Sequence, residues 1–472
     1  MTLHLHNTLT GRKEEFRPIE PGVARLYTCG PTVWNFAHVG NWRTFLVYDL
    51  LRRHLRVSGY RVEQLINITD VDDRIIEQAA AAGETISEYT RPYVEAFLED
   101  VRALRAQEVE AYPRATGHIE EMIALIERLM EEGHAYEVDG DVYFRIASFP
   151  QYGALSHLDR AGLRAGARVA TDKYEKESAT DFALWKRAKQ DDERVGAAWE
   201  ASFGRGRPGW HIECSAMAMQ YLGETLDIHA GGMDLLFPHH ENEIAQSEAA
   251  TGRQFARYWV HSAHVTDDTG AKMSKTEGNF ATLRDVEAAG HDPLAVRLFL
   301  LGNAHYRSQL RLTDEGLVGA AAQLARLRDF ADRVRRLEPG LRSDDSGLFQ
   351  SVQDARDGYR DALDDDLNLP EGLGIVFEVV REANAALDAG RVGPAGREAL
   401  LGLLEDLDAH LDVLREEEVT LDAAEERLIA QREEARRSRD FATADRIRDD
   451  LRDRGIVLED SREGVRWKVA RR

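Results

Sequence analysis

Short apolar runs alternate with helical patterns in the N-terminal part of the chain. Val23 to Thr28 form a strand-like run that ends at the turn-forming residues Cys29-Gly30-Pro31-Thr32. From Trp42 to Leu55 the apolar residues recur mostly at helical spacing, and Tyr60 to Thr69 is strand-like again. A strand, a helix and a strand in this order predict a parallel α/β sheet.

The rest of the chain divides into segments of different character. A long helical stretch, Thr85 to Glu132, is broken at Tyr112-Pro113, and the α/β pattern resumes at Gly209 after a stretch of short strand-like runs and loops. From about Thr313 the chain is almost entirely helical until a small non-helical ending. We expect the first half of a sheet domain at 1–132, an insertion at 133–207 and the second half of the sheet domain at 208–262. A connecting region at 263–312, a helical domain at 313–415 and a small α+β domain at 416–472 should follow.

Composition narrows the class of protein. A chain of 472 residues has room for about three domains, and 43% hydrophobic residues rule out wholesale disorder. The formal net charge of −23 argues against a protein that coats nucleic acid through its overall charge. We find no uncharged apolar run of about 18 residues. Because Met1 to Phe16 also lacks a basic start followed by an apolar stretch, we expect no membrane span, no signal peptide and a cytoplasmic location.

A first candidate for chemistry is the run His38-Val39-Gly40-Asn41, at a predicted strand-to-helix crossing. Such a crossing points helix N–H groups at its ligand and suits phosphate, with Gly40 allowing a flat ring to approach closely. His38 and Asn41 could donate hydrogen bonds to phosphate oxygens. The simpler alternative is a polar helix start. No Gly-x-x-x-x-Gly-Lys-Ser/Thr sequence occurs, which excludes a Walker-type phosphate loop.

A second candidate is a metal site around Pro238 to Glu243. His239 and Glu243 lie four residues apart and His240 and Glu243 three apart, so either histidine could share a metal with the carboxylate. The chain has two cysteines, Cys29 and Cys214, which exclude a disulfide framework and a four-cysteine zinc ribbon. Two thiolates, one imidazole and one carboxylate would make a four-ligand zinc site. The alternative to a metal site is that each cysteine is a small buried apolar residue and that the histidines cap the start of a helix.

A third candidate is Lys272-Met273-Ser274-Lys275-Thr276, in a loop flanked by glycines. Two lysines on a flexible loop can swing onto a polyphosphate and neutralise the charge that builds up on a leaving group. The alternative is a solvated basic turn.

Together these motifs resemble the class I aminoacyl-tRNA synthetases and, within that class, the cysteinyl-tRNA synthetases. His38 to Asn41 is similar to the first class signature, and Lys272 to Thr276 is similar to the second, with Thr276 in place of serine. The motifs typical of the cysteine-specific enzymes are Tyr27 to Val33, Gly209 to Met217, Asp227 to Gly232, Phe237 to Gln246, His305 to Ser308 and Ile456 to Trp467. The resemblance spans nearly the whole chain. It implies a Rossmann-type catalytic domain, a helical domain that binds the anticodon stem and a small anticodon-recognition domain.

The resemblance also implies roles for individual residues. The zinc ligands fall on Cys29, Cys214, His239 and Glu243, and the zinc also takes the thiolate of substrate cysteine. Serine, with a harder and less acidic hydroxyl, would gain little from the metal. The implied substrate-binding residues are Cys29, Thr69, Trp210 and His229. The implied ATP-binding residues are His38, Gly40, Asn41, Gly231, Gly232, Asp234 and Lys275, and the implied catalytic residues are His38, Asn41, Lys272 and Lys275.

The implied reaction has two steps. Cysteine and ATP, with Mg²⁺, give cysteinyl-adenylate and pyrophosphate, and the 3′ end of the tRNA for cysteine then takes the cysteinyl group. A monomer is the usual state in the family. Because the chain is acidic overall, tRNA binding would rest on local basic surface such as Arg466, Lys468, Arg471 and Arg472. Two alternatives stay open: a ligase that joins cysteine to an amino sugar, and a catalytically silent RNA-binding relative.

Overall fold

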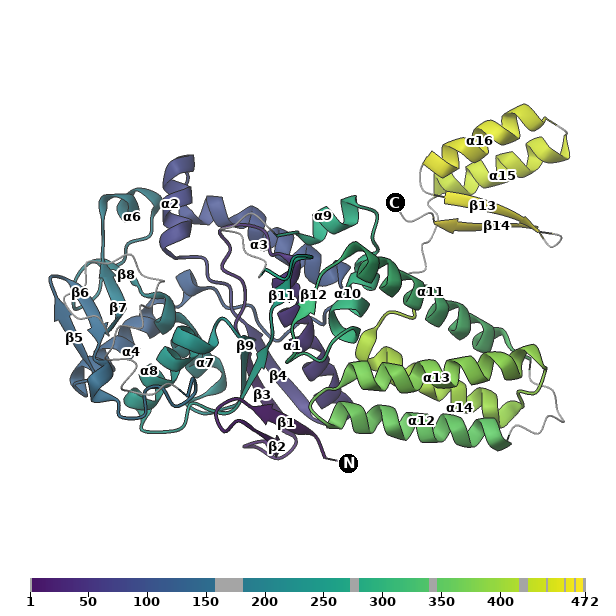
Figure 1. Cartoon of the computed structure of the whole chain (residues 1–472). Helices are drawn as coiled ribbons and strands as arrows, with labels where there is room; N and C mark the ends of the chain where they lie inside the picture. The colour runs from purple at the N-terminus through teal and green to yellow at the C-terminus, as the bar shows by residue number, and fades with distance from the viewer. Residues whose placement is uncertain are drawn as a thin grey trace.

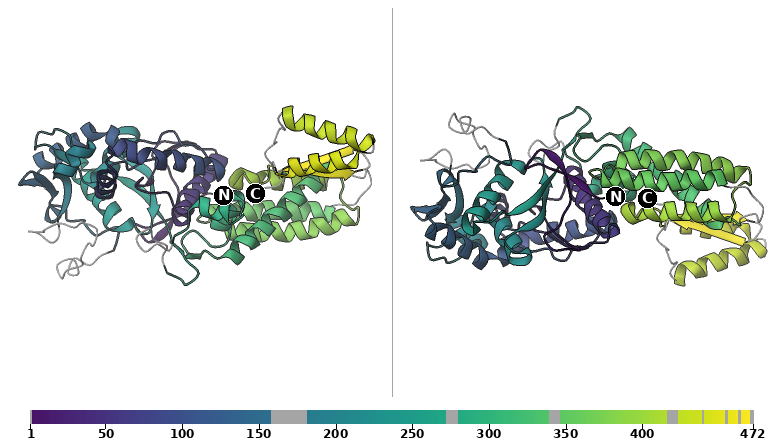
Figure 2. Two further views of the ribbon diagram at one scale, coloured as in Figure 1. Left: turned by 90° about the horizontal axis from the view of Figure 1, so that it is seen from above. Right: turned by 90° about the horizontal axis from the view of Figure 1, so that it is seen from below.

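A computed structural model of the chain describes residues 2–157, 181–271, 280–338, 346–415, 423–438, 440–453, 456–461 and 464–469. The molecule is elongated in all three views, with a sheet-containing body at one end and a helical bundle at the other (Figures 1 and 2). The sheet-containing body, formed by the described residues before Asp314, is called the catalytic body after the role that the resemblance implies. None of the described helices is long and apolar enough to cross a membrane.

The centre of the catalytic body is a parallel sheet, as the sequence predicts. Its strand order is β10-β9-β3-β4, and the strands are β3 (Val23–Thr28), β4 (Arg61–Ile66), β9 (Leu226–Gly232) and β10 (Ala256–Ser262). Thr28, at the end of β3, pairs with Ile66 on one side and Ala230 on the other, so the carboxyl ends of three strands meet. The chain leaves β3 toward β4 and returns on the opposite side as β9. This change of direction is where open α/β sheets bind their ligands.

Side chains of successive strand residues enter two different cores. Leu26 and Ile228 belong to the core shared with α1 (Val39–Val57) and α10 (Pro293–Gly302). Tyr27 and Trp259 belong to the core on the other face, which includes residues of α4 (Ile119–Glu131), α7 (Trp210–Leu222) and α8 (Glu241–Thr251). This alternation is what a strand covered on both faces requires.

Helices and turns of the catalytic body agree with the expected pattern at most positions. The break at Tyr112-Pro113 is confirmed, because it lies between α3 and α4. The helix α2 was not predicted. The remaining elements are α2 (Asp73–Ala82), α3 (Ile86–Ala103), η1 (Ala115–Gly117), α4 (Ile119–Glu131), α7 (Trp210–Leu222), η3 (Leu236–His240), α8 (Glu241–Thr251) and α9 (Leu283–Ala288).

A second, antiparallel sheet lies inside the expected insertion and forms the end of the molecule farthest from the bundle (Figure 1). Its order is β5-β6-β7-β8, and its elements are β5 (Ala135–Val138), β6 (Asp141–Phe144), η2 (Ile146–Ser148), β7 (Phe182–Arg187), α6 (Gln190–Val195) and β8 (Gly206–Pro208). Lys186 and Arg207 from this sheet both bind the carboxylate of Asp73 at the start of α2. These ion pairs attach the insertion to the catalytic body.

Two short strand pairs were not anticipated. An N-terminal hairpin is formed by β1 (His4–Asn7) and β2 (Arg12–Glu15). A parallel pair is formed by β11 (Val265–Thr266) and β12 (Leu310–Arg311). Both are too short to produce a clear apolar pattern in the sequence.

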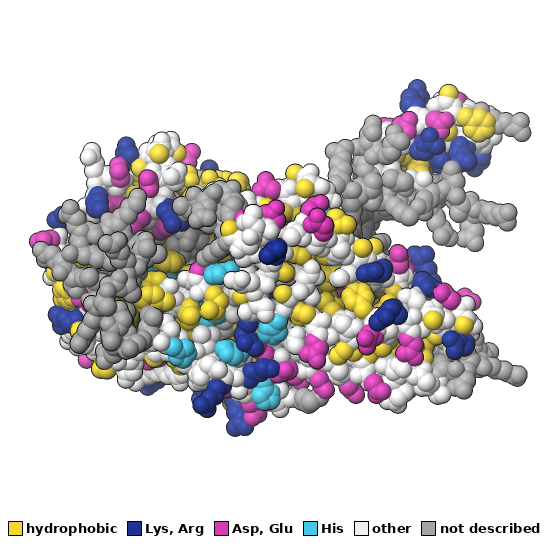
Figure 3. Space-filling view, in the orientation of Figure 1, with side chains coloured by type: hydrophobic (Ala, Val, Ile, Leu, Met, Phe, Trp, Pro, Cys, Tyr) yellow, Lys and Arg dark blue, Asp and Glu magenta, His cyan; other side chains and the backbone are white. Residues whose placement is uncertain are grey.

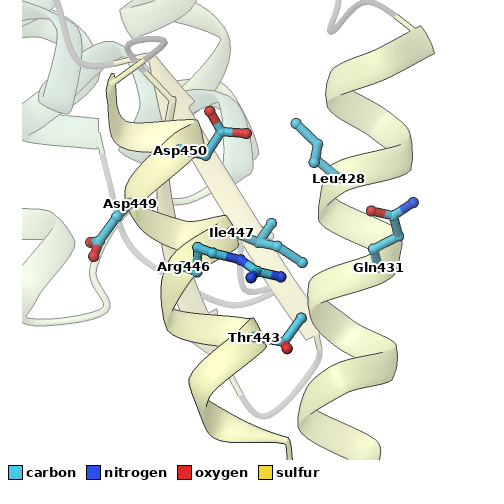
Figure 4. Close-up of a pocket in the computed structure, with 7 residues that line it drawn as sticks. All are labelled: Leu428, Gln431, Thr443, Arg446, Ile447, Asp449 and Asp450. Atoms are coloured by element: carbon cyan, nitrogen blue, oxygen red, sulfur yellow. The ribbon is translucent and has the colours of Figure 1, made fainter.

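The C-terminal part of the chain is helical from Asp314, as predicted. The bundle consists of α11 (Asp314–Arg336), α12 (Ser346–Asp364), α13 (Leu369–Asp388) and α14 (Pro394–Leu411), and its core is continuous with that of α1 and α10. The last unit comprises α15 (Ala423–Arg437), α16 (Phe441–Asp453), β13 (Ile456–Ser461) and β14 (Gly464–Val469). Figure 4 shows a pocket between α15 and α16, lined by Leu428, Gln431, Thr443, Arg446, Ile447, Asp449 and Asp450.

Candidate active site and metal centre

Four potential ligand side chains converge at the carboxyl end of the central sheet. Cys29 follows β3, Cys214 lies in α7, His239 lies in η3, and Glu243 lies in the first turn of α8. One donor atom from each lies within 4.8 Å of the others, and all four residues are buried. The grouping therefore brings together residues that are as much as 214 positions apart.

Local structure explains how two of these ligands are presented. The helix α7 starts at Gly209, where a Cβ atom would lie 2.1 Å from the carbonyl oxygen of Ala183, so only glycine lets the helix begin this close to β7. Cys214 then follows in the second turn. His239 Nε2 lies 3.0 Å from Glu243 Oε1, as expected for residues one helical turn apart.

A second set of donors overlaps the first. Cys29 and Glu243 also group with His229 and His240, with His240 Nε2 3.4 Å from Cys29 Sγ. His240 is held by His261, whose Nε2 lies 2.8 Å from His240 Nδ1. The sequence left open whether His239, four residues from Glu243, or His240, three residues from it, would share a metal with that carboxylate. In the structure both histidines lie near it, with Nε2 of His239 at 3.0 Å and Nε2 of His240 at 4.0 Å from Glu243 Oε1.

Electrostatics favour a cation at this centre. Burial raises the pKa of Cys29 well above its usual value, and neighbouring Cys214 raises it further. Burial also opposes ionisation of Cys214, but contacts with Cys29 and His239 lower its pKa to about 6. Against the effect of burial, His229 and His239 lower the pKa of Glu243 to about 2, while Glu243 and Cys214 raise that of His239 to about 10. The shifts of Cys214, Glu243 and His239 all favour the charged form of these groups, and a divalent cation at this point can take the place of the protons on the donor atoms.

The expected substrate-binding residues surround this centre. The indole of Trp210 stacks on His239, with ring centroids 4.3 Å apart. His229 Nε2 hydrogen-bonds to the Glu243 carboxylate, which accepts, and the His229 ring stacks on Trp259. Thr69 forms a parallel bridge with Thr32, beside the Cys29 turn. Trp210 and His229 thus contact members of the four-residue group, and Thr69 lies beside the turn that carries Cys29.

The first signature forms a helix start. His38 is the N-cap of α1: its Nδ1 accepts from the Asn41 backbone N–H at 3.1 Å, and its own N–H donates to Asn41 Oδ1 at 3.2 Å. A Cβ atom on Gly40 would lie 2.9 Å from the His38 ring, so this glycine admits the capping imidazole. The run thus forms a polar helix start with a glycine packing contact, which is compatible with either interpretation, and phosphate binding stays a prediction. The helix nevertheless directs its N-terminus to the same edge of the sheet.

The other expected ATP-binding residues divide into two groups. Gly231 and Gly232 end β9, and a Cβ atom on Gly232 would lie 2.5 Å from the carboxylate of Asp234. Lys272 and Lys275 lie outside the described residues. The described chain after their loop pairs with the first signature, because Val39 N–H donates to the Ala281 carbonyl at 2.8 Å.

The sequence motifs assign no role to several buried residues of the site. Nδ1 of His211 lies 3.0 Å from Nδ1 of His239, and Gln246 donates to the His211 carbonyl at 2.9 Å. His261 links His240 to Thr8 of the N-terminal hairpin. His261 directly follows the apolar run Tyr258 to Val260, and that run is the signal that could have pointed to it. His211 lies inside the motif Gly209 to Met217, whose pattern does not reveal its contact with His239.

Comparison with known proteins agrees with this geometry. The model for the class I tRNA synthetase (C) catalytic domain matches residues 15–322, a DALR domain matches 358–415, and the cysteinyl-tRNA ligase anticodon-binding domain matches 419–467. A cysteine–tRNA ligase of Solibacter usitatus is 48% identical over 471 residues, which cover 99% of this chain and 100% of that protein. The chain belongs to the cysteine–tRNA ligase family of class I aminoacyl-tRNA synthetases. The family resemblance seen in the motifs is thereby confirmed.

Further relatives of this cysteine–tRNA ligase family member support the same assignment. The cysteine–tRNA ligase of Symbiobacterium thermophilum is 47% identical over 479 residues, with both chains covered completely. A solved methionyl-tRNA synthetase of Mycobacterium tuberculosis, in complex with methionyl-adenylate, superposes with a TM-score of 0.59 over 83% of this chain and 89% of its own. At 16% identity, this likeness shows the shared class I fold.

Proposed function

We propose that this synthetase activates L-cysteine with ATP and transfers it to the 3′ end of the tRNA for cysteine. The cysteine carboxylate attacks the α-phosphorus of ATP, which forms cysteinyl-adenylate and releases pyrophosphate. A terminal ribose hydroxyl of the tRNA then attacks the adenylate carbonyl, and AMP leaves. No side chain acts as a covalent nucleophile, so the protein contributes positioning and electrostatic stabilisation.

The donor set fits zinc better than a hard cation. Two thiols, one imidazole and one carboxylate suit tetrahedral zinc, whereas Mg²⁺ prefers oxygen ligands. Cys29, Cys214, His239 and Glu243 would hold the ion, as the family resemblance implies. When bound, zinc supplies a Lewis acid that stabilises a thiolate, which distinguishes cysteine from serine.

Residues of this chain orient the rest of the substrate. Trp210, Thr69 and His229 are buried or packed around the metal centre and would form the wall of the amino-acid pocket. His38, Gly40 and Asn41 at the start of α1, with Gly231, Gly232 and Asp234 after β9, would bind ATP together with Mg²⁺. Lys272 and Lys275 would neutralise charge on the leaving pyrophosphate.

The bundle and the C-terminal unit would bind the tRNA. The pocket in Figure 4 combines apolar Leu428 and Ile447 with polar side chains such as Arg446, an arrangement that suits a splayed RNA base. On the face shown in Figure 3, basic and acidic side chains are interspersed over the bundle, so RNA contacts would be local. A monomer that works in the cytoplasm is part of this proposal.

The observation that carries the proposal is the meeting of two thiols, an imidazole and a carboxylate at the carboxyl end of the sheet of a class I fold. The experiment is ATP–pyrophosphate exchange and tRNA charging with cysteine, with serine as the comparison. We expect exchange that depends on cysteine, with serine at least about a thousandfold poorer in kcat/KM. Absence of cysteine-dependent exchange would contradict the proposal.

A further inference from the structure

The turn between α12 and α13 has an unusual backbone. Asp366 and Leu367 have φ angles of 64° and 54°, in the left-handed region, and both are buried. A residue other than glycine keeps this conformation only where surrounding contacts impose it. The turn lies at the end of the bundle that meets the catalytic body, so its contacts join the two parts.

The carboxylate of Asp366 binds two separate segments of the catalytic body. Its Oδ1 accepts from the His6 backbone N–H at 2.8 Å and from the Tyr306 hydroxyl at 2.6 Å. Its Oδ2 accepts from Arg307 Nε at 2.7 Å. The first donor lies in the N-terminal hairpin, and the other two lie between α10 and β12.

The backbone of Asp366 adds two further bonds to the same segments. Its N–H donates to the His4 carbonyl at 2.9 Å, and its carbonyl lies 2.9 Å from His305 Nε2. One fully buried residue of the bundle therefore makes five hydrogen bonds to the catalytic body.

The segment that contacts Asp366 also contacts the helix of the first signature. Arg43, fully buried in α1, donates from Nη2 to the His305 carbonyl at 3.0 Å and from Nη1 to the Ala263 carbonyl at 3.4 Å. The Ala263 N–H in turn donates to the Tyr306 carbonyl at 2.8 Å. Residues 305–307 thus lie between the bundle on one side and the helix that begins at His38 on the other.

We propose that Asp366 is a positioning residue for the transfer step. It fixes the bundle against residues 305–307, so that a tRNA held by the bundle presents its 3′ end to the adenylate in one orientation. Loss of the carboxylate loosens this joint, slows transfer to tRNA and leaves adenylate formation unchanged. The inference rests on the proposed function, because the proposed function assigns tRNA binding to the bundle.

The test compares the two half-reactions in Asp366→Asn and Tyr306→Phe. Asp366→Asn keeps the shape but replaces one acceptor oxygen with an amide donor that faces other donors, and Tyr306→Phe removes a single hydrogen bond. We expect cysteine-dependent ATP–pyrophosphate exchange within about twofold of the parent, and kcat/KM for tRNA charging at least about tenfold lower in Asp366→Asn. Tyr306→Phe should lower kcat/KM for tRNA charging by about threefold.

The control is Lys13→Ala, which removes the exposed ion pair between Lys13 and Asp365 beside the joint. Both half-reactions should keep their parent rates in this variant. Thermal unfolding of each variant identifies loss of folded protein. If Asp366→Asn does not fold, the two half-reactions of Tyr306→Phe test the inference. Charging at the parent rate in a folded variant, or exchange that falls in proportion to charging, overturns the inference. A parent enzyme without cysteine-dependent exchange would instead contradict the proposed function.

Discussion

His229 and Glu243 meet in the fully buried centre of the site, with 2.8 Å between His229 Nε2 and Glu243 Oε2. The other oxygen of the same carboxylate lies 3.0 Å from His239 Nε2. His229 therefore holds one oxygen of Glu243 and turns the other toward the proposed metal ligands. Groups that orient a ligand in this way tune metal affinity.

The first prediction concerns this contact. His229→Ala should lower zinc affinity by about 10- to 100-fold, because the carboxylate of Glu243 loses the partner that orients it. Competition with a chromophoric chelator measures the change. His118→Ala is the control, since His118 is a half-buried histidine that contacts Tyr221 outside the centre. Equal zinc affinity in both variants would show that the contact does not orient the ligand.

A second prediction concerns a buried ion pair that joins α1 to α10. Asp49 accepts from Arg53 Nε at 2.8 Å and from Arg297 Nη2 at 2.5 Å, and Arg297 is fully buried. Asp49→Asn leaves the fully buried guanidinium of Arg297 without its ion-pair partner and should cost about 3–5 kcal/mol in the free energy of unfolding of the catalytic body. Urea denaturation measures it. The control Asp191→Asn removes an exposed pair with Arg194 and should leave the urea midpoint unchanged.

The same pair predicts how stability depends on pH. Burial would raise the pKa of Asp49, but Arg297 and Arg53 outweigh it and lower the pKa below its usual range. A lowered folded-state pKa adds stability above the unfolded value of about 3.9, and this stability is lost as the pH falls through the folded value. The difference in urea midpoint between the parent and Asp49→Asn should therefore shrink as the pH falls from 6 to 3. A constant difference over this range would contradict the assignment.

The first signature gives a prediction that separates chemistry from folding. Asn41→Ala breaks the capping box of α1 and removes a proposed phosphate donor, so kcat for adenylate formation should fall by about 10²- to 10³-fold. Pre-steady-state adenylate formation measures it. Glu88→Ala breaks the equivalent capping box of α3, a helix that holds none of the proposed site residues, and serves as the control. A similar kcat for the two variants would show that Asn41 acts only in the capping box of α1 and not in adenylate formation.

Local and distant relationships were not equally visible in the sequence. The strand at Val23–Thr28 and the helix after it follow from apolar spacing alone, and the structure has both. Spacing alone could not decide between His239 and His240, because both lie within one turn of Glu243. The family resemblance favours His239, and the structure brings both histidines to Cys29 or its partners. The contacts of Asp366 join residues as much as 360 positions apart, and no local pattern encodes such a pairing.

The central claim is that Cys29, Cys214, His239 and Glu243 hold zinc that selects cysteine. The most direct measurement is the zinc content of purified Cys214→Ser, together with its KM for cysteine in ATP–pyrophosphate exchange. We predict one zinc per chain in the parent enzyme, loss of zinc retention in the variant and a steep rise in KM for cysteine, because a serine hydroxyl is a poor zinc ligand. A zinc-free variant that activates cysteine with the KM of the parent would contradict the claim.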